Sequence, residues 1–518
     1  MTIATDKRIA IIGAGPSGAI ALDTFLEYGF SKIRVFERKK VPGGTWNDDK
    51  QVGVPVDNVL PTIDEPNADA PIPVPEEVAA GTKDEPVTIK THNTKRRYEE
   101  ASIYPELETN IIPPLMSFRK KPVPKEPTSN SFEKYGEADT FRKADTINRY
   151  VTSFFEGRDN FVSYNTTVEK AEQPEGPGTP WVLTLRKSID AENSEWWSET
   201  FDFLYVAIGR FNVPRADNIP GLKEAAKIVP PGTILHTKYY RDPKHFSGKK
   251  TLIVGAAFSS IDIVHLVRDY AQAPLYLSAN IVIAFILDAF KQPFVDARGR
   301  IAKIEVNKDG KTIDAYFEDG SVVDQIERLV LSTGYKTSYP FLEEYTAKYG
   351  GLVTKDNLLK NTYLTTWWNQ DPSLAIAGVF TDGVLLKASE TQAAATAGLW
   401  SGLPGSGLPS KEEQIKWETD RRNNQKLAVE WHIWFPDFGS ILNQILQVGG
   451  GSAQLSKISG VDFSDSDELA NYQLQSFGLK SVYWSKVAKD WIEKHPDSQD
   501  RYNKTVEYID SIKWPKSE

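Results

Sequence analysis

The chain has 518 residues, which is enough for two or three domains with a sizeable hydrophobic core. Its 61 Lys and Arg residues against 70 Asp and Glu residues give a formal net charge of −9, which disfavours nucleic acid as a partner. The absence of cysteine excludes disulfides, thiolate metal sites and a cysteine nucleophile. The six histidines are scattered without metal-ligand spacing, so the sequence predicts no metal site.

The N-terminus is predicted to enter a domain directly, because it has neither the basic flank nor the cleavage site of a signal peptide. The longest apolar-rich run, Ile281–Phe290, is too short to span a bilayer and contains Asp288. We therefore expect a soluble, cytoplasmic protein without an integral membrane anchor. The sequence leaves homodimer formation open.

The first elements in chain order are a strand over residues 8–13, a helix over 17–28 and a second strand over 32–38. The strands are apolar runs, and the helix carries apolar residues at helical spacing. This β-α-β order predicts an α/β fold with a parallel, doubly wound sheet.

The turn between the first strand and the helix has the complete spacing G-x-G-x-x-G. Gly13 permits the tight turn, Gly15 lets the backbone approach a pyrophosphate, and Gly18 lets the helix pack close to the strand. Glu37 ends the second strand, where its carboxylate can accept hydrogen bonds from a ribose. The candidate cofactor-binding residues of this dinucleotide site are Gly13, Gly15, Pro16, Ser17, Gly18 and Glu37.

The segment after the second strand, "ERKKVPGGTWND", extends this pattern in a way that NAD dehydrogenases do not. It resembles the FAD-binding segment of flavin-containing monooxygenases and Baeyer–Villiger monooxygenases, with Gly43, Gly44 and Trp46 at the matching positions. Gly44, Thr45 and Trp46 are therefore candidate FAD-binding residues. A Gly-Gly turn with a packing Trp is the plain alternative.

Residues 50–97 are rich in proline and lack periodicity, so we expect an extended surface insertion there. The next stretch, "ASIYPELETNIIPPLMSF", resembles the flavin-containing monooxygenase segment that carries an asparagine beside the flavin ring. The matching residues are Ser102, Tyr104, Leu107, Thr109, Asn110, Pro113, Met116 and Phe118. The resemblance implies that Asn110 is catalytic and that Thr109 binds the cofactor. Asn110 as a cap for the turn before the proline pair is the alternative.

The middle of the chain is predicted to hold a helix near 138–156 and then strands, with one strand running through "TFDFLYVAIG" to Gly209. The segment 202–222 resembles the family's A-T-G-H-x-x-x-P strand and loop, although Ile208 and Arg210 replace Thr and His. By this resemblance, Gly209 is a candidate cofactor-binding residue.

The stretch "PPGTILHTKYYRDP" resembles the family's identifying motif F-x-G-x-x-x-H-x-x-x-[FY]-[KR], with Pro230 in place of Phe. Tyr240 and Arg241 are candidate cofactor residues by this resemblance, and His236 is implied to link the domains structurally. Tyr240–Arg241 also favours heteroatom oxygenation, because Baeyer–Villiger enzymes have Trp followed by Pro or Asp at this point. "VLSTGYKTSYPFL" resembles the F-A-T-G-Y linker, where Thr333, Gly334 and Tyr335 match.

A second strand–turn–helix, "TLIVGAAFSSID", has lost two glycines of the nucleotide-binding spacing. Ala257 and Ser260 stand where glycine is expected, and Phe258 is a bulky residue that the pattern does not explain. In the chain this turn lies between the motifs at 230–243 and 330–342, where the family has its pyridine-nucleotide loop. The candidate NADPH-binding residues of this loop are Gly255, Ala257, Phe258, Ser259 and Ser260.

The strand after this loop ends in Ser278, Ala279 and Asn280, without the acid that selects NADH. The arginine that the family often places there is also absent, and Arg241 or Arg268 is the cation that we expect to replace it. We predict a preference for NADPH over NADH. A further strand is predicted over 324–335.

The resemblance runs from Arg8 to about Trp417 and includes "SETQAAATAGLW", in which Gln392 is a candidate cofactor-binding residue. The expected domains are a FAD-binding domain over 1–215 and 330–410, an NADPH-binding domain over 216–329, and a helical, tryptophan-rich C-terminal extension over 411–518. The insertion over 50–97 and the lack of a hydrophobic C-terminal anchor resemble the soluble, yeast or fungal-type members.

The resemblance implies a class B flavoprotein monooxygenase that uses FAD, NADPH and O2 on a small-molecule substrate. NADPH reduces FAD, and a flavin hydroperoxide then oxygenates a soft nucleophile, an amine nitrogen or a thioether sulfur. Three alternatives stay open: Baeyer–Villiger oxygenation of ketones, an NADPH oxidase or flavin reductase that releases H2O2, and a FAD-binding protein with a degenerate NADPH site.

Overall fold

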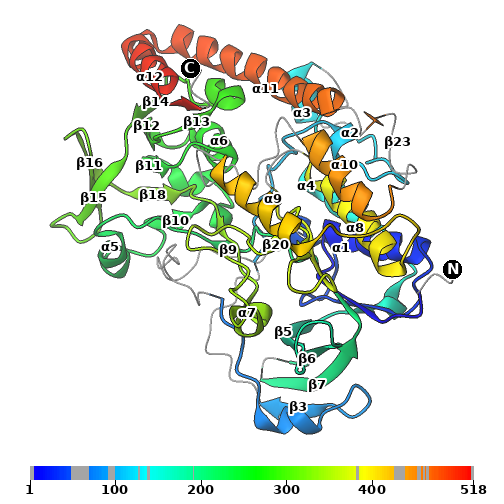
Figure 1. Ribbon diagram of the computed structural model, residues 1–518. Helices are drawn as coiled ribbons and strands as arrows, with labels where there is room; N and C mark the ends of the chain where they lie inside the picture. Colours follow the sequence, from blue (N-terminus) through cyan, green and yellow to red (C-terminus); the bar gives the residue numbers. More distant parts are fainter. Residues whose placement is uncertain are drawn as a thin grey trace.

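The computed structural model describes residues 5–47, 69–90, 100–126, 129–136, 140–190, 192–380, 384–424, 438–451, 457–458, 461–462 and 466–514. Two largely parallel sheets form its centre, and a smaller antiparallel sheet lies below them in Figure 1. Helices flank both parallel sheets, and further helices make up most of the described C-terminal part. The predicted α/β class with two Rossmann-like units and a helical C-terminal extension is confirmed.

The first sheet has seven strands; β21, next to the edge strand β20, is antiparallel to both of its neighbours, and the other pairs are parallel. In sheet order its strands are β20 (Thr362–Tyr363), β21 (Trp367–Trp368), β22 (Leu374–Ile376), β8 (Phe203–Val206), β1 (Ile9–Ile12), β2 (Ile33–Phe36) and β4 (Val162–Ser163). All four residues of β1 are buried, as its continuous apolar run predicts for a central parallel strand. Helix α1 (Pro16–Glu27) follows β1 and begins with proline at its first position, where no backbone donor is needed.

The second sheet has five parallel strands. In sheet order they are β10 (Ile234–His236), β18 (Arg328–Leu331), β11 (Lys250–Val254), β12 (Gln272–Ser278) and β14 (Val295–Arg298). Helix α6 (Phe258–Val267) follows β11 in the same way that α1 follows β1. The two glycine turns therefore occupy equivalent places in the two sheets, at the carboxyl ends of central strands.

Two antiparallel sheets adjoin these. They are β3 (Val87–Lys90), β7 (Asn193–Phe201), β6 (Trp181–Ser188) and β5 (Thr166–Glu172), and β15 (Ile301–Val306), β16 (Ile313–Phe317) and β17 (Val322–Ile326). The predicted insertion over 50–97 is described at 69–90, where a short 3-10 helix (Glu76–Ala80) precedes β3. Because β3 pairs with β7, this part of the insertion belongs to a sheet. Residues 50–68 and 91–97 lie outside the described residues.

Two stretches that were each predicted as one strand are divided between sheets. β7 ends at Phe201 and β8 begins at Phe203, because the Asp202 carboxylate accepts the Arg8 N–H at 2.8 Å and turns the chain. Similarly, β17 and β18 are separated just after Gln325, whose φ is +49°. Both predictions of a single strand were wrong, since apolar alternation carries no information about a change of sheet.

The C-terminal part is built from α9 (Lys411–Asn423), α10 (Phe438–Val448), α11 (Ser466–Lys494) and α12 (Gln499–Ser511). Helix α11 runs along the top of the molecule in Figure 1, from the five-stranded sheet to α2 and α3. Trp431 and Trp434 of the predicted tryptophan-rich segment lie outside the described residues. Within the described ranges, no helix has the length and apolar character needed to cross a membrane.

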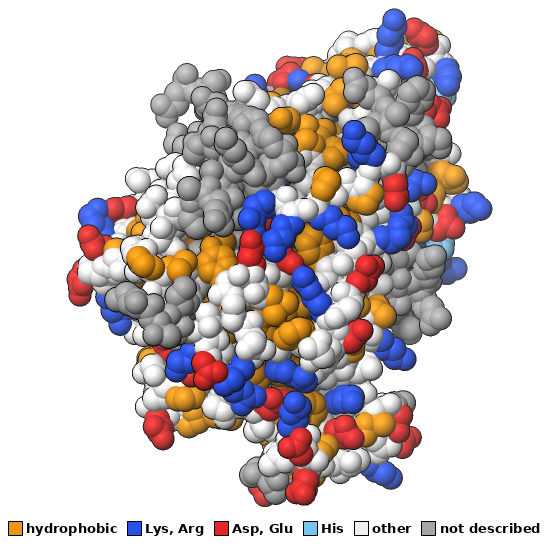
Figure 2. All heavy atoms as spheres, turned by 90° about the vertical axis from the view of Figure 1, so that its right-hand side faces the viewer, with side chains coloured by type: hydrophobic (Ala, Val, Ile, Leu, Met, Phe, Trp, Pro, Cys, Tyr) orange, Lys and Arg blue, Asp and Glu red, His pale blue; other side chains and the backbone are white. Residues whose placement is uncertain are grey.

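The other elements are short. They are α2 (Pro113–Met116), α3 (Ser129–Tyr135), α4 (Ala144–Thr152), α5 (Leu222–Ile228), α7 (Pro340–Ala347), α8 (Leu385–Ser401), β9 (Val213–Pro214), β13 (Val282–Ile283), β19 (Tyr335–Lys336), β23 (Lys457–Ile458), β24 (Val461–Asp462) and β25 (Lys513–Trp514). α8 is the long exception and is almost wholly buried, packed against α1 and α10. On the face drawn in Figure 2, basic and acidic side chains lie among one another, with apolar patches between them.

Candidate active site

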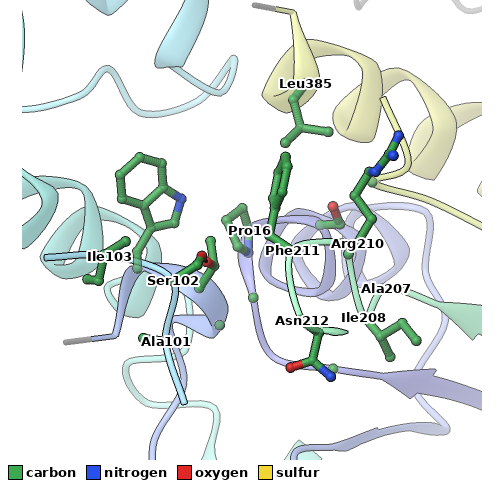
Figure 3. A pocket seen from close by; sticks show the side chains of 18 of the residues that line it. Pro16, Ala101, Ser102, Ile103, Ala207, Ile208, Arg210, Phe211, Asn212 and Leu385 are labelled. Atoms are coloured by element: carbon green, nitrogen blue, oxygen red, sulfur yellow. Dashed lines mark hydrogen bonds between the residues drawn. The ribbon is translucent and has the colours of Figure 1, made fainter. Parts of the chain in front are cut away.

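A cavity of about 420 Å³ lies where the first glycine turn, the Asn110 segment and Phe258 at the start of α6 come together. The sequence-predicted residues that line it are Gly13, Gly15, Pro16, Ser17, Glu37, Gly44, Thr45, Trp46, Thr109, Asn110, Gly209 and Phe258. Figure 3 shows part of this lining, with Pro16 facing the segment Ala101–Ile103 on one side and the loop after β8 on the other. Segments far apart in the sequence therefore meet around one space.

The first glycine turn needs its glycines for steric reasons. Gly13 has φ +102°, and a Cβ there would lie 2.7 Å from the Ala207 carbonyl oxygen. A Cβ on Gly18 would lie 2.0 Å from the Gly13 carbonyl oxygen, so α1 packs directly on the turn. A Cβ on Gly44 would lie 2.7 Å from the Gly15 Cα, which brings the second glycine pair against the first turn. The α1 N-terminus has no side-chain cap, so its amides face the cavity without a side-chain acceptor.

Glu37 is buried, and its carboxylate closes the turn. It accepts the Ala14 N–H at 2.7 Å through one oxygen and the Lys39 N–H at 2.8 Å through the other. Each carboxylate oxygen has a second lone pair, so both can still accept a hydroxyl. The position of Glu37 in the cavity lining thus suits a ribose acceptor.

The Asn110 segment is held from both sides. The Thr109 N–H donates to the Arg142 carbonyl at 2.8 Å, and the Thr109 hydroxyl accepts the Arg142 N–H at 3.1 Å. Two residues beyond Asn110, the Ile112 N–H donates to the Ser476 hydroxyl at 3.1 Å. The Asn110 side-chain amide lines the cavity and makes no hydrogen bond to any residue that the structure describes. It is a positioned amide that is available to a ligand.

The loop after β8 brings two large side chains to the cavity. In Figure 3 the Phe211 ring stands beside Leu385, and the Arg210 side chain points toward α8. The Arg210 guanidinium donates to the Val379 carbonyl at 3.3 Å, and burial lowers its pKa to about 10. The guanidinium remains charged at neutral pH at that pKa.

The second glycine turn keeps one glycine for the same reason as the first. Gly255 has φ +100°, and a Cβ there would lie 2.6 Å from the Ser332 carbonyl oxygen. Ser260 is fully buried, and its hydroxyl accepts the Ala257 N–H at 2.8 Å and donates to the Ala257 carbonyl at 2.7 Å. This side chain therefore occupies one amide that a glycine at position 260 leaves open to a phosphate.

Several predicted site residues lie away from the cavity lining. They are Gly18, Tyr240, Arg241, Gly255, Ala257, Ser259, Ser260, Thr333, Gly334, Tyr335 and Gln392. The Arg241 guanidinium donates to the carbonyls of Lys238, Tyr240 and Ala101 at 2.6–2.9 Å. Arg268 follows the last residue of α6, at the opposite end of this helix from the second turn.

Gln392 and the linker residues have structural contacts. The Gln392 side chain is fully buried in α8 and donates to the Thr366 hydroxyl at 2.9 Å. Thr333 donates to the Arg215 carbonyl, and the Gly334 carbonyl accepts the Arg215 N–H at 3.0 Å. These hydrogen bonds join the segment between β18 and β19 to the residue that follows β9.

His236 joins the same linker to β10. Its Nε2 lies 2.9 Å from the Gly334 carbonyl, and its Nδ1 accepts the Lys238 N–H at 3.1 Å. This pattern requires the neutral ring with the proton on Nε2. Burial lowers the pKa of His236 to about 3, so the ring is neutral near neutral pH, as a structural role requires.

Acidification should destabilise the protein through this histidine. In the unfolded chain this histidine binds a proton below its pKa of 6.5, whereas in the folded protein the ring stays neutral until the pH nears 3. The contribution of the neutral ring to stability is therefore fully present above pH 6.5 and is lost as the pH falls. When the pH is lowered from about 7.5 to about 5.5, the free energy of unfolding of His236→Asn should fall by about 1.4 kcal/mol less than that of the wild type. Urea unfolding followed by tryptophan fluorescence measures this difference, and equal acid sensitivity of the two proteins would contradict it.

Some cavity residues could not be found from the sequence. Arg210, Phe211, Leu385, Leu386 and Phe477 line the cavity, but none of them was predicted as a site residue. They come from a loop and two helices whose relative positions depend on the packing of the whole chain. Only the replacement of the family's His by Arg210 was visible beforehand, as a departure from a motif.

The first dinucleotide-type turn lines the cavity together with the Asn110 amide, and the second turn reaches the lining through Phe258, an arrangement that suits an oxidoreductase with two dinucleotide cofactors. Residues 297–453 match the family model described as flavin-binding monooxygenase-like. The chain is 27% identical over 441 residues to a flavin-containing monooxygenase of Amanita muscaria, a match that covers 76% of this chain and 78% of the relative. It is also 27% identical to the trimethylamine monooxygenase of Methylocella silvestris, covering 72% of this chain and 69% of that protein.

The fold agrees with a solved structure. The S-allyl-L-cysteine S-oxygenase of Allium sativum superposes with a TM-score of 0.64 at 20% identity, covering 92% of this chain and all of that one. The chain is similar to flavin-containing monooxygenases in sequence and in fold. It is accordingly an oxygenase and a flavoprotein, and its cofactors are FAD and NADPH.

The residues present fit these cofactors. The first turn lies so close to Gly44 that a Cβ on Gly44 would meet the backbone of Gly15. Because these glycines carry no side chains and the α1 N-terminus has no side-chain cap, the backbone amides are uncovered, as pyrophosphate binding requires. The second turn keeps the glycine that its backbone requires and has no acid at the end of β12. It offers one amide fewer, because Ser260 holds the Ala257 N–H.

Proposed function

We propose that this enzyme inserts one oxygen atom from O2 into a soft nitrogen or sulfur nucleophile of a small molecule, with electrons from NADPH. For a thioether, the balanced reaction converts one thioether, one O2, one NADPH and one H⁺ to one sulfoxide, one NADP⁺ and one water. One oxygen atom forms the new sulfur–oxygen bond, the other leaves as water, and NADPH supplies two electrons. The single observation that carries the proposal is the Asn110 amide in the shared cavity, without a partner among the described residues.

In this proposal the first turn and its surroundings hold FAD. The α1 amides and the backbone of Gly13, Gly15 and Gly44 face the pyrophosphate, and Glu37 accepts the ribose hydroxyls. The second turn, from Gly255 to Ser260, holds NADPH. FAD supplies the transfer of two electrons from NADPH and the activation of O2.

The chain's own residues then orient the reactants and exclude water. The Asn110 amide can donate to one group and accept from another without releasing a proton, since it has no acidic hydrogen near neutral pH. The hydrogen bonds of Thr109 and Ile112 hold it in place before any ligand arrives. The apolar lining from Met116, Leu385 and Phe477 keeps the space around it dry.

Relatives of both kinds support the choice of nitrogen or sulfur. One is named a trimethylamine monooxygenase, and the protein of similar fold from Allium sativum is named an S-oxygenase. We also propose that residues 1–215 and 330–410 form the FAD-binding domain and that residues 216–329 form the NADPH-binding domain. The seven-stranded and five-stranded sheets support this division, because each carries one glycine turn.

The proposed reaction is tested by its products. Purified enzyme with NADPH, O2 and either thioanisole or trimethylamine should form the S-oxide or N-oxide in a yield close to the NADPH consumed. H2O2 should be a minor product. Oxidation of NADPH that yields only H2O2 with every amine and thioether tried would refute the proposal and favour an NADPH oxidase.

A preference for NADPH over NADH is the companion prediction. The end of β12 has no carboxylate to repel a ribose phosphate, so the specificity constant for NADPH should exceed that for NADH by about tenfold. Steady-state rates of flavin reduction with each coenzyme measure the ratio. Equal specificity constants would contradict the prediction.

One observation favours a second candidate, a FAD-binding protein whose NADPH site is degenerate. The Ala257 amide is held by Ser260, and Phe258 adds bulk to the turn. The two candidates separate when NADPH is mixed with the anaerobic protein. Rapid bleaching of the bound flavin supports the monooxygenase, whereas unchanged flavin absorbance supports the degenerate site.

A further inference from the structure

The Asn110 end of the cavity is bounded by aromatic rings from distant parts of the chain. Phe258 begins α6, and Phe477 comes from the middle of α11. Both line the cavity, and their ring centroids are 5.7 Å apart. Phe477 also lies 4.6 Å from the ring of Phe285, and its side chain is 3% exposed. Phe258, which no sequence motif explains, thus forms half of a wall whose other half comes from the C-terminal extension.

Helix α11 is fastened beside Asn110 by specific contacts. Ser476, the neighbour of Phe477, is fully buried and accepts the Ile112 N–H at 3.1 Å. One turn further on, the Lys480 ammonium lies 4.5 Å from the centroid of the Phe141 ring, and Phe141 precedes the Arg142 backbone that holds Thr109. The backbone that carries Asn110 and the helix that carries Phe477 are therefore bonded to each other. The distance between the wall and the amide is built into the fold.

The chemistry of this end of the cavity is mainly apolar. Apolar residues from neighbouring segments also line the cavity, among them Leu107, Ile111, Met116, Leu385 and Leu386. Glu108, the carboxylate in this part of the lining, lies 3.6 Å from the Lys134 ammonium. An alkylammonium would have to lose its hydration here against apolar walls, whereas a neutral thioether loses little. At neutral pH an amine with a pKa near 10 is also neutral in only about one molecule in a thousand.

We propose that Phe477 is a specificity-determining residue, which together with Phe258 limits the length of the apolar group that a substrate carries on its reacting heteroatom. The preferred substrates are then small, neutral thioethers with a short apolar substituent. Substituents that reach beyond the wall are excluded by the rings. This inference rests on the proposed function, since it concerns the substrate of the same site.

The test compares two thioethers of different length, thioanisole and benzyl phenyl sulfide, in wild type and two variants. Phe477→Ala should raise the ratio of kcat/KM for benzyl phenyl sulfide to that for thioanisole by about 10-fold to 100-fold, because it removes a ring from the wall. Phe477→Leu, which keeps most of the packing, should raise the ratio in the same direction by a smaller factor. Leu474→Ala is the matched control, because Leu474 lies on the same helix but is 47% exposed, and its ratio should stay within about twofold of the wild type.

Two measurements keep the outcomes separate. FAD content and the rate of flavin bleaching by NADPH should be unchanged in all variants, so that a changed ratio reports the substrate wall. An unchanged ratio in both Phe477 variants with wild-type FAD content would overturn the inference and leave the proposed function standing. Failure of the wild type to oxygenate either sulfide would overturn the inference that thioethers are preferred, and the same failure with trimethylamine as well, with H2O2 as the product, would overturn the proposed function itself. A ratio shift of equal size in Leu474→Ala would also overturn the inference, because it would assign the effect to the helix in general.

Discussion

Asn110→Leu should abolish oxygenation while the protein keeps its FAD. Leucine has nearly the same size as asparagine but cannot donate or accept a hydrogen bond, so the cavity loses its positioned amide without a steric change. Removal of one such fixed donor lowers turnover by about 100-fold or more in other enzymes. We expect a fall of at least that size in S-oxide or N-oxide formation, measured by chromatography, with NADPH consumption diverted to H2O2.

Two comparisons make this result specific. FAD content, measured by absorbance after gel filtration, should equal that of the wild type, because no described hydrogen bond of the fold depends on the Asn110 side chain. Asn110→Gln keeps an amide but displaces it, and it should retain part of the coupling between NADPH consumption and product. Loss of FAD from Asn110→Leu would mean that Asn110 has a structural role, as a cap of the turn before Pro113.

Gly18→Ala should release FAD and destabilise the fold. The new Cβ would lie 2.0 Å from the Gly13 carbonyl oxygen, so α1 must move away from the first turn. Overpacking of this kind costs about 3 kcal/mol, and the displaced helix carries the amides that face the pyrophosphate. We expect purified Gly18→Ala to contain little FAD and to unfold at lower urea concentration than the wild type.

Gly478→Ala supplies the matched control, because it places the same methyl group in another helix. Gly478 lies in α11, and a Cβ there would have no atom within 4 Å. Alanine is a better helix former than glycine by about 1 kcal/mol, so this variant should be as stable as the wild type or more stable. Equal FAD loss in both variants would show that close packing at Gly18 is not the cause.

Much of the cofactor architecture could be predicted from the sequence because it depends on local sterics. Gly18 is required by a backbone distance within one strand–turn–helix, which follows from residue spacing, whereas Gly13 is required by its positive φ and by the Ala207 carbonyl after β8. Periodicity likewise predicted the elements around them, which became β1, α1 and β2. The Asn110 segment was found by resemblance, and the structure brings it to the same cavity as the first turn.

Predictions that required knowledge of the tertiary packing failed or could not be made. The strands around Asp202 and Gln325 change sheets at points that apolar alternation does not mark. The sequence also does not show that the Ser260 hydroxyl accepts the Ala257 N–H or that the Gln392 side chain donates to the Thr366 hydroxyl. The roles of Ser260 and Gln392 in cofactor binding stay predictions.

The sequence by itself indicated two dinucleotide-type turns, since these depend on residue spacing within short segments, and its resemblance to flavin-containing monooxygenases pointed to the Asn110 amide. Only the tertiary structure decided what surrounds the reacting position, because that wall is made from side chains far apart in the chain. The motif around Phe258 does not explain a bulky residue there, whereas the structure places its ring centroid 5.7 Å from that of Phe477, as part of the same wall. A dinucleotide site can therefore be predicted from a short segment, whereas the wall proposed to select the substrate depends on the long-range packing of α11 against the Asn110 segment.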